Sequence, residues 1–134
     1  MLDLIIKNGK CYIDGQLKNQ DIGIKDGLIQ NIGEISDEAK EILNAEGQTI
    51  LPGCIDTQTH FREPGSTDTE DLHSGSRAAI AGGITGVFEM PNTNPPTSTK
   101  LEFQKKLDLA KNRMYCNYAF YFGATADNAD DLAS

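Results

Sequence analysis

Long apolar runs, basic clusters and paired cysteines are all missing from this chain of 134 residues, and each absence excludes a class of protein. No apolar stretch approaches the roughly 18 residues that a membrane-spanning helix needs. The N-terminus, Met1 to Lys7, lacks a basic region and a small-residue cleavage site, so we expect no secretory signal peptide. With 12 Lys and Arg against 20 Asp and Glu, the net charge is −8, which makes nucleic acid and anionic membranes poor partners.

The cysteines are too few and too far apart to define a fold. Cys11, Cys54 and Cys116 are odd in number and form no C-x-x-C pair. This favours reduced thiols in a cytoplasmic protein over a disulfide framework or a zinc knuckle. Hydrophobic residues make up 38% of the chain and glycine occupies 13 positions, together close to an ordinary globular protein, which argues against disorder, collagen and coiled coil.

Residues 1–50 have a sequence pattern typical of short strands separated by turns. Asn8-Gly9, Asp14-Gly15 and Asp26-Gly27 follow short apolar or alternating segments, a spacing typical of β-hairpins. A helical period is weak here and is confined to Asp37–Leu43. We therefore predict a small antiparallel β unit, one layer of a sandwich.

Strands alternate with helices from residue 51 onward. Strands are predicted over Gly53–Thr59, Ile84–Met90 and Met114–Phe122, and helices over Thr69–Ala81, from Ser98-Thr99 to Arg113, and from Asp127 to Ser134. This alternation with apolar strands predicts a parallel sheet covered by helices. On the second helix, Leu101, Leu107 and Leu109 are among the expected apolar positions.

Only about two and a half βα units are present, whereas a (β/α)8 barrel takes about 250 residues. The alternatives are a small open α/β protein and the truncated start of a barrel. Such a short sheet would expose much apolar surface, so we favour the truncated barrel over residues 51–134 and expect the chain to fold poorly alone.

The densest polar stretch, Asp56 to Gly65, begins in the first of these strands and runs past its end. Alternation along a strand predicts Asp56, Gln58 and His60 on one face, at the end where barrel enzymes hold their active sites. A polar row in an apolar strand needs a metal, a ligand or a hydrogen-bond network. A single histidine at a strand end is also typical of a structural residue, so the pattern alone leaves both interpretations open.

A second polar loop, Met90 to Pro96, follows the next strand and carries Asn92 and Asn94. Alone it resembles an ordinary Asn/Pro turn, but two such loops after successive strands favour one shared site. The second histidine, His73, is predicted on the outer surface of the first helix. The acidic residues Glu63, Asp68, Glu70 and Asp71 suit the positive end of that helix.

Three motifs in order make the chain resemble the cyclic amidohydrolases, specifically dihydroorotase. They are P-G-x-I-D-x-x-x-H-F-R-E-P-G, G-S-R-A-A-x-A-G-G-I-T and M-P-N-T-N-P-P. The resemblance implies an α/β fold, with a small β-sandwich portion over residues 1–50 ahead of the first βα units of a metal-bearing (β/α)8 barrel. It also implies reversible hydrolysis of dihydroorotate to N-carbamoyl-aspartate in pyrimidine biosynthesis, with one or two divalent metals, foremost zinc.

The resemblance assigns roles to four residues. His60 matches the second histidine of the family motif D-x-H-x-H, a metal ligand, and Asp56 matches the leading aspartate, which we expect to support the strand end. Arg62 and Asn92 match residues that bind the substrate. A guanidinium suits the carboxylate of dihydroorotate, whereas allantoinases, which resemble this family, tend to carry asparagine at the position of Arg62.

Gln58 is the one departure, because it stands where the motif has its first histidine. A neutral amide oxygen is a poor zinc ligand, so the site would bind metal weakly, hold one ion, or have lost catalysis. The resemblance places the catalytic aspartate and the remaining ligands after residue 134, so no catalytic residue is expected within this chain. Two alternatives therefore stay open. One is a non-catalytic homologue that assembles with another pyrimidine enzyme such as aspartate transcarbamoylase, and the other is a hydantoinase- or allantoinase-type enzyme. A homo-oligomer is equally compatible with the sequence.

Overall fold

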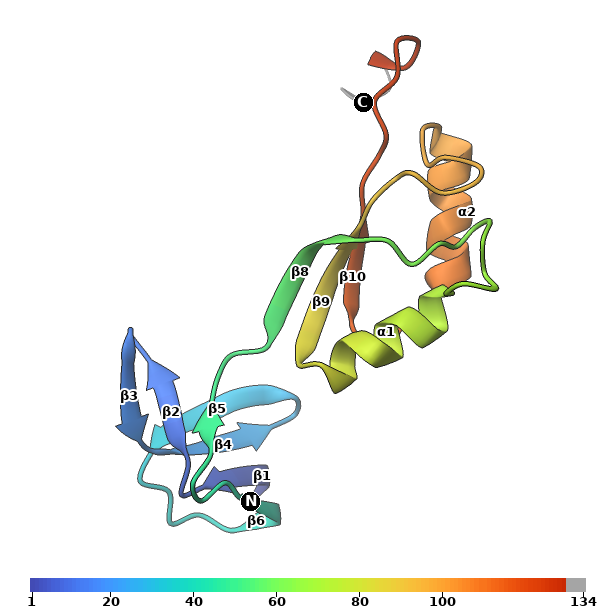
Figure 1. The fold of residues 1–134 in the computed structure, drawn as a ribbon. Helices are drawn as coiled ribbons and strands as arrows, with labels where there is room; N and C mark the ends of the chain where they lie inside the picture. Colours follow the sequence, from blue (N-terminus) through green and yellow to red (C-terminus); the bar gives the residue numbers. More distant parts are fainter. Residues whose placement is uncertain (130–134) are drawn as a thin grey trace. The chain divides into compact units, whose positions relative to one another are not determined.

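The computed structural model describes residues 1–129, and the chain divides into two compact units, Met1–Pro52 and a second that begins at Gly53 (Figure 1). Most of the helix predicted from Asp127 to Ser134, residues 130–134, lies outside the described residues. Within residues 1–129, no helix is both long enough and apolar enough to cross a membrane.

The first unit is built from short strands in two sheets. The strands are β1 (Leu2–Lys7), β2 (Lys10–Ile13), β3 (Gln16–Asn19), β4 (Asp21–Lys25), β5 (Leu28–Gly33), β6 (Ala39–Asn44) and β7 (Thr49–Ile50). One sheet has the order β5-β4-β1-β6 and the other β3-β2-β7. The β4–β5, β1–β4 and β2–β3 pairs are antiparallel, but β6 and β7 pair in parallel with β1 and β2. The prediction of a purely antiparallel unit was therefore wrong: β5 and β6 occupy opposite edges, so the chain returns across the sheet.

Two of the three predicted hairpins are confirmed. Asp14-Gly15 (φ 52° and 77°) joins β2 to β3, and Asp26-Gly27 (φ 51° and 75°) joins β4 to β5. Positive φ at both central residues gives the turn a twist that matches the paired strands. Asn8-Gly9 instead leads from one sheet to the other, where a side chain on Gly9 would collide with Ile50.

The weak helical period over Asp37–Leu43 does not produce a helix. This segment contributes most of β6, whose residues pair with β1 from Leu2↔Ala39 to Lys7↔Asn44. An ion pair between Lys40 and Asp3, with Nζ and Oδ1 2.6 Å apart, supports the same register. Long-range pairing with β1 therefore overrides the local pattern.

The second unit has the predicted βα alternation. Its elements are β8 (Cys54–Thr59), α1 (Leu72–Ala81), β9 (Ile84–Glu89), α2 (Lys100–Ala110) and β10 (Asn117–Phe120). The strands form a parallel sheet in the order β10-β9-β8, and both helices lie on the same side of it (Figure 1). The carboxyl ends of all three strands therefore meet at one edge.

Both helices begin at a side-chain cap. Asp71 caps α1 by accepting a hydrogen bond from the Ser74 amide at 2.6 Å, and the Asp71 amide donates to the Ser74 hydroxyl at 3.2 Å. This capping box starts the helix later than predicted. The hydroxyl of Thr99 caps α2 by accepting from the Glu102 amide at 3.2 Å. The helix ends at Ala110, before the predicted Arg113, and the chain then turns through a left-handed Asn112 (φ 60°).

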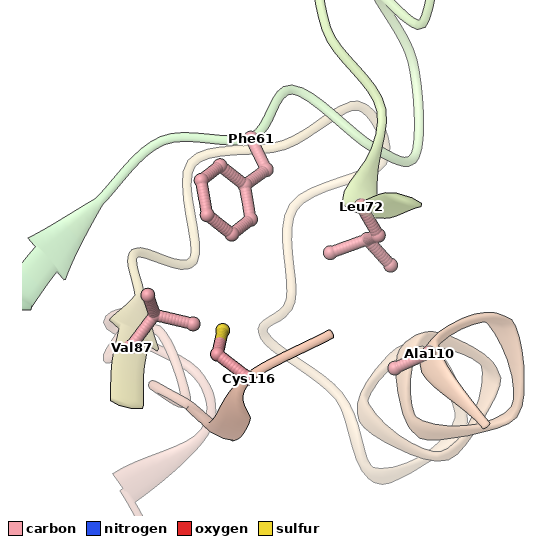
Figure 2. Packing of buried hydrophobic residues seen from close by; sticks show 5 residues of the cluster. All are labelled: Phe61, Leu72, Val87, Ala110 and Cys116. Carbon is pink, nitrogen blue, oxygen red and sulfur yellow. The ribbon is translucent and has the colours of Figure 1, made fainter. Parts of the chain in front are cut away.

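The core of the second unit lies between the sheet and the helices (Figure 2). It consists of Phe61, Leu72, Val87, Ala110 and Cys116. Phe61 comes from the loop after β8, and its ring lies so close to Gly75 of α1 that a Cβ there would collide with it. This contact fixes the start of the predicted site loop against the helix.

Candidate functional site

Two polar loops leave the sheet at the carboxyl ends of β8 and β9. The Met90 amide donates to the Thr59 carbonyl at 2.9 Å, where the strands end, and the Asn94 amide donates to the Pro64 carbonyl at 3.0 Å, further along the loops. These bonds join His60–Gly65 to Met90–Thr97 along their length. We refer to the two loops together as the rim.

The rim brings His60 and Asn92 into direct contact. His60 Nδ1 lies 2.9 Å from Asn92 Oδ1, although the two residues are 32 positions apart. An amide oxygen only accepts hydrogen bonds, so Nδ1 carries the proton in this arrangement and Nε2 keeps its lone pair. A ring nitrogen held in this way by a carbonyl oxygen is typical of histidines that ligate metal through the other nitrogen.

Arg62 lies two residues further along the same loop, with its side chain exposed and a left-handed backbone (φ 62°). The Ser66 amide donates to its carbonyl at 3.0 Å, which closes a tight turn. Within residues 1–129, the guanidinium makes no hydrogen bond or ion pair. It is therefore free to receive an anionic group.

A register shift interrupts β8 within the predicted polar row of Asp56, Gln58 and His60. Asp56 pairs with Val87 and Thr59 pairs with Glu89, so an extra residue is inserted in β8 between them. A bulge of this kind breaks the two-residue alternation and redirects side chains, often beside functional sites. Asp56 Oδ1 accepts a hydrogen bond from the Gln58 amide at 3.0 Å, which supports the irregular strand end.

The donor set of the rim matches a metal site only in part. His60 offers one imidazole nitrogen, and Gln58 offers a neutral amide oxygen. No group of three or more His, Cys, Asp or Glu side chains that could hold an ion occurs in the part of the chain that the structure describes. These residues therefore supply one good ligand and do not by themselves complete a metal centre.

Glu63 has a role that the sequence did not indicate. Its carboxylate is buried and accepts hydrogen bonds from Arg113 Nη1 at 2.8 Å and Nη2 at 3.1 Å, and from the Leu72 amide at 2.9 Å. The carboxylate raises the pKa of the Arg113 guanidinium. Instead of only favouring the start of α1, Glu63 clamps the Arg62 loop to that helix and to the segment before β10. The partners are 50 positions apart, so no local pattern reveals them.

A fully buried ion pair was also missed. Glu89, the last residue of β9, and Lys106 of α2 are both fully buried, with Nζ and Oε2 3.0 Å apart. Burial raises the pKa of Glu89 and lowers the pKa of Lys106, and each charge opposes the shift of the other. The apolar positions predicted on α2 are confirmed in part, since Leu109 packs against the core, but Leu101 is 64% exposed whereas Lys106 is buried.

The remaining candidates lie away from the rim. His73 packs edge-to-face against Tyr115, with ring centroids 5.1 Å apart, as expected for a residue on the outer helix surface. A hollow of about 630 Å³ belongs to the first unit, where Asn8, Lys10, Asp21 and Glu34 are among its lining residues. Neither feature adds a group to the rim.

Comparison with known proteins identifies the class to which this fold and rim belong. The sequence pattern of the amidohydrolase family matches residues 49–131, and the chain belongs to this family. An allantoinase of Escherichia coli O1:K1 / APEC is 39% identical over 131 residues, covering 97% of this chain and 29% of the relative. A dihydroorotase of Carboxydothermus hydrogenoformans is 47% identical over 98 residues, covering 71% of this chain and 23% of the relative.

The solved structure of L-hydantoinase (dihydropyrimidinase) from Arthrobacter aurescens matches with a TM-score of 0.90 and 32% identity, over 98% of this chain and 30% of that structure. This match confirms the predicted fold, a β portion followed by the start of the amidohydrolase barrel. The chain spans less than a third of the length of these relatives. They are named for three different activities, so the comparisons establish membership in the cyclic amidohydrolase family without choosing a substrate.

Proposed function

We propose that the protein containing this chain is a dihydroorotase-type cyclic amidohydrolase, to which this chain contributes the first part of the substrate-binding rim. One observation carries the proposal: an unpaired Arg62 lies on the same rim as the hydrogen-bonded pair of His60 and Asn92. The reaction adds water to the ring amide of dihydroorotate, breaks the carbonyl C–N bond and gives N-carbamoyl-aspartate.

The positive charge of Arg62 supports dihydroorotate as the substrate. Dihydroorotate carries a ring carboxylate, and a planar guanidinium can bind it through two parallel hydrogen bonds. Asn92 uses Oδ1 for His60, so its Nδ2 group remains free to donate to the same substrate. Allantoin and simple hydantoins lack that carboxylate and would leave Arg62 unpaired.

His60 would hold a divalent metal through Nε2, while Asn92 keeps the ring in the required tautomer. A metal of this kind, when bound, lowers the pKa of its water and polarises the amide carbonyl. We propose zinc, as one or two ions, with the amide oxygen of Gln58 as a weak additional ligand. The other ligands and the aspartate that moves the proton would come from outside the described residues.

The experiment is Arg62→Ala in the full-length protein, assayed with dihydroorotate. Losing a hydrogen-bonded charge pair should raise KM by roughly 10- to 100-fold. Arg77→Ala, which removes an exposed arginine on α1, is the matched control and should leave KM unchanged. An Arg62→Ala protein with unchanged KM, or a wild-type protein that prefers allantoin or a hydantoin, would remove the substrate assignment.

Gln58 favours a second candidate, a homologue without catalysis that has a structural role in a complex with a pyrimidine enzyme such as aspartate transcarbamoylase. Counting bound metal and measuring turnover on one preparation separates the two candidates. At least one metal per chain with turnover supports the enzyme. A folded, metal-free and inactive protein that co-elutes with aspartate transcarbamoylase supports the structural role.

A further inference from the structure

We propose that Lys106 and Glu89 are positioning residues, whose buried ion pair fixes the Met90–Thr97 loop so that Asn92 meets His60. The catalytic consequence rests on the proposed function. The geometric consequence, the contact between Asn92 and His60, does not depend on it.

Glu89 is a rigid anchor because it ends the central strand of the sheet. Its carbonyl accepts from the Tyr121 amide at 2.9 Å, and the next residue, Met90, donates its amide to Thr59 at 2.9 Å. Backbone pairing thus holds this position on both sides. Among the described residues, neither carboxylate oxygen accepts a well-directed hydrogen bond, so the Lys106 ammonium is the main balance for its charge.

Lys106 connects this anchor to both ends of the loop. Besides Glu89, its Nζ reaches the Met90 carbonyl at 3.3 Å and the Thr97 hydroxyl at 3.4 Å, with the Phe120 ring centroid 5.2 Å away. An ammonium has three N–H donors, and three oxygen atoms surround this one. Met90 opens the loop and Thr97 closes it, so one buried group fixes both ends.

The segment between these ends is short and internally bonded. The Thr97 amide donates to the Pro91 carbonyl at 2.9 Å, and the Thr93 and Thr97 hydroxyls lie 3.3 Å apart. Asn92 itself is exposed and, among the described residues, its side chain contacts only His60 through a hydrogen bond. Its position therefore depends on where Lys106 holds the loop. An apolar pair could fill the same space but could not bind the Met90 carbonyl or the Thr97 hydroxyl.

The test replaces both charges in the full-length protein with apolar residues of similar size, Glu89→Leu with Lys106→Met. Replacing Lys106 alone would leave a buried carboxylate without its partner, whereas the double variant removes that penalty. The first readout is ¹⁵N NMR of labelled histidine, with the hydrogen-bonded Nδ1–H signal of His60 assigned by its loss in Asn92→Ala. We expect the double variant to lose this signal, and Lys105→Met, a neighbouring exposed lysine, to keep it.

The second readout is kinetic. We expect KM for dihydroorotate to rise about tenfold in the double variant. Adding Asn92→Ala should raise KM by a smaller factor in the double variant than in the wild type, because the double variant has already displaced Asn92 from its place on the rim. A folded double variant with an unchanged His60 signal and unchanged KM would show that the pair is only structural.

Absence of turnover in the wild type would count against the proposed function alone, since the NMR signal still tests the positioning role. If the double variant does not fold, Thr97→Val keeps the ion pair but removes one loop contact. Weakening of the His60 signal in that variant would support the proposal, and an unchanged signal would overturn it.

Discussion

Gln58 is the residue whose chemistry most affects the metal content of the rim. It occupies the position at which the related motif has a histidine, and the bulge in β8 lies between Asp56 and Thr59, around it. We expect Gln58→His in the full-length protein to tighten zinc binding by about tenfold or more, because an imidazole replaces a neutral amide oxygen. Competition with a chelator of known affinity measures this change.

Gln104→His serves as the control for that experiment, since Gln104 is exposed on α2 and bonds only to Asp108, at 3.1 Å, among the described residues. It should leave zinc affinity unchanged. Equal zinc affinity in Gln58→His and wild type would mean that the side chain at position 58 does not face the metal.

Asp71 links a single carboxylate to the pH dependence of stability. Hydrogen bonds from Ser74 lower the pKa of Asp71 below its ordinary value of 3.8. A lowered pKa means that the stabilising effect is complete above pH 3.8 and is lost as the pH falls through the folded-state value. Asn also caps helices but does not titrate. In Asp71→Asn, the free energy of unfolding should therefore fall less steeply than in the wild type as the pH drops below 3.8.

The free energy of unfolding of the full-length protein, measured in urea between pH 2 and 6, tests this expectation. Asp127→Asn, which removes an exposed carboxylate, is the comparison and should follow the wild type. An Asp71→Asn profile parallel to that of the wild type would show that the cap charge contributes nothing.

At the scale of elements, the loop after β8 is held by Glu63 and not only by backbone contacts. Glu63→Gln keeps the size of the side chain but removes the charge that pairs with Arg113. We expect a loss of about 1–3 kcal/mol in the free energy of unfolding, because the Leu72 amide and the guanidinium lose a charged acceptor. Glu102→Gln, which breaks the surface pair with Lys105, should cost less than about 1 kcal/mol.

Urea titrations of both variants measure the difference. If both variants lose the same free energy of unfolding, the buried pair of Glu63 with Arg113 is no more stabilising than the surface pair of Glu102 with Lys105.

Elements with local causes were predictable from the sequence, and those with distant causes were not. The Asp14-Gly15 hairpin follows from two residues that tolerate positive φ. The meeting of the loops that carry His60 and Asn92 follows from the rule that parallel strands end at one edge. By contrast, β6 depends on pairing with β1, and the register shift before Thr59 depends on β9. Lys106 has no local signal, because only the distant Glu89 makes its burial favourable.

At the scale of the whole chain, the second unit exposes apolar side chains of its sheet and of the segment after β10. Ile55 is 62% exposed, Phe88 38% and Tyr121 40%. Among the described residues, the buried core on the helix side is small by comparison, with five members. Burying apolar surface stabilises a fold by about 25 cal/mol per Å². The surface that stays exposed contributes none of this, so the unit lacks part of the hydrophobic stabilisation of a complete domain.

We therefore expect residues 1–134 expressed alone to bind a hydrophobic dye, to self-associate in sedimentation experiments and to unfold without a sharp transition. The full-length protein, in which further chain is available to cover this surface, should melt cooperatively and bind little dye. Replacing Ile55 and Phe88 with threonine should reduce dye binding by residues 1–134. In the full-length protein, the same change should lower the melting temperature if those side chains are buried there. A sharp, monomeric melt of residues 1–134 would contradict the expectation, because it would show that the core beneath α1 and α2 is sufficient.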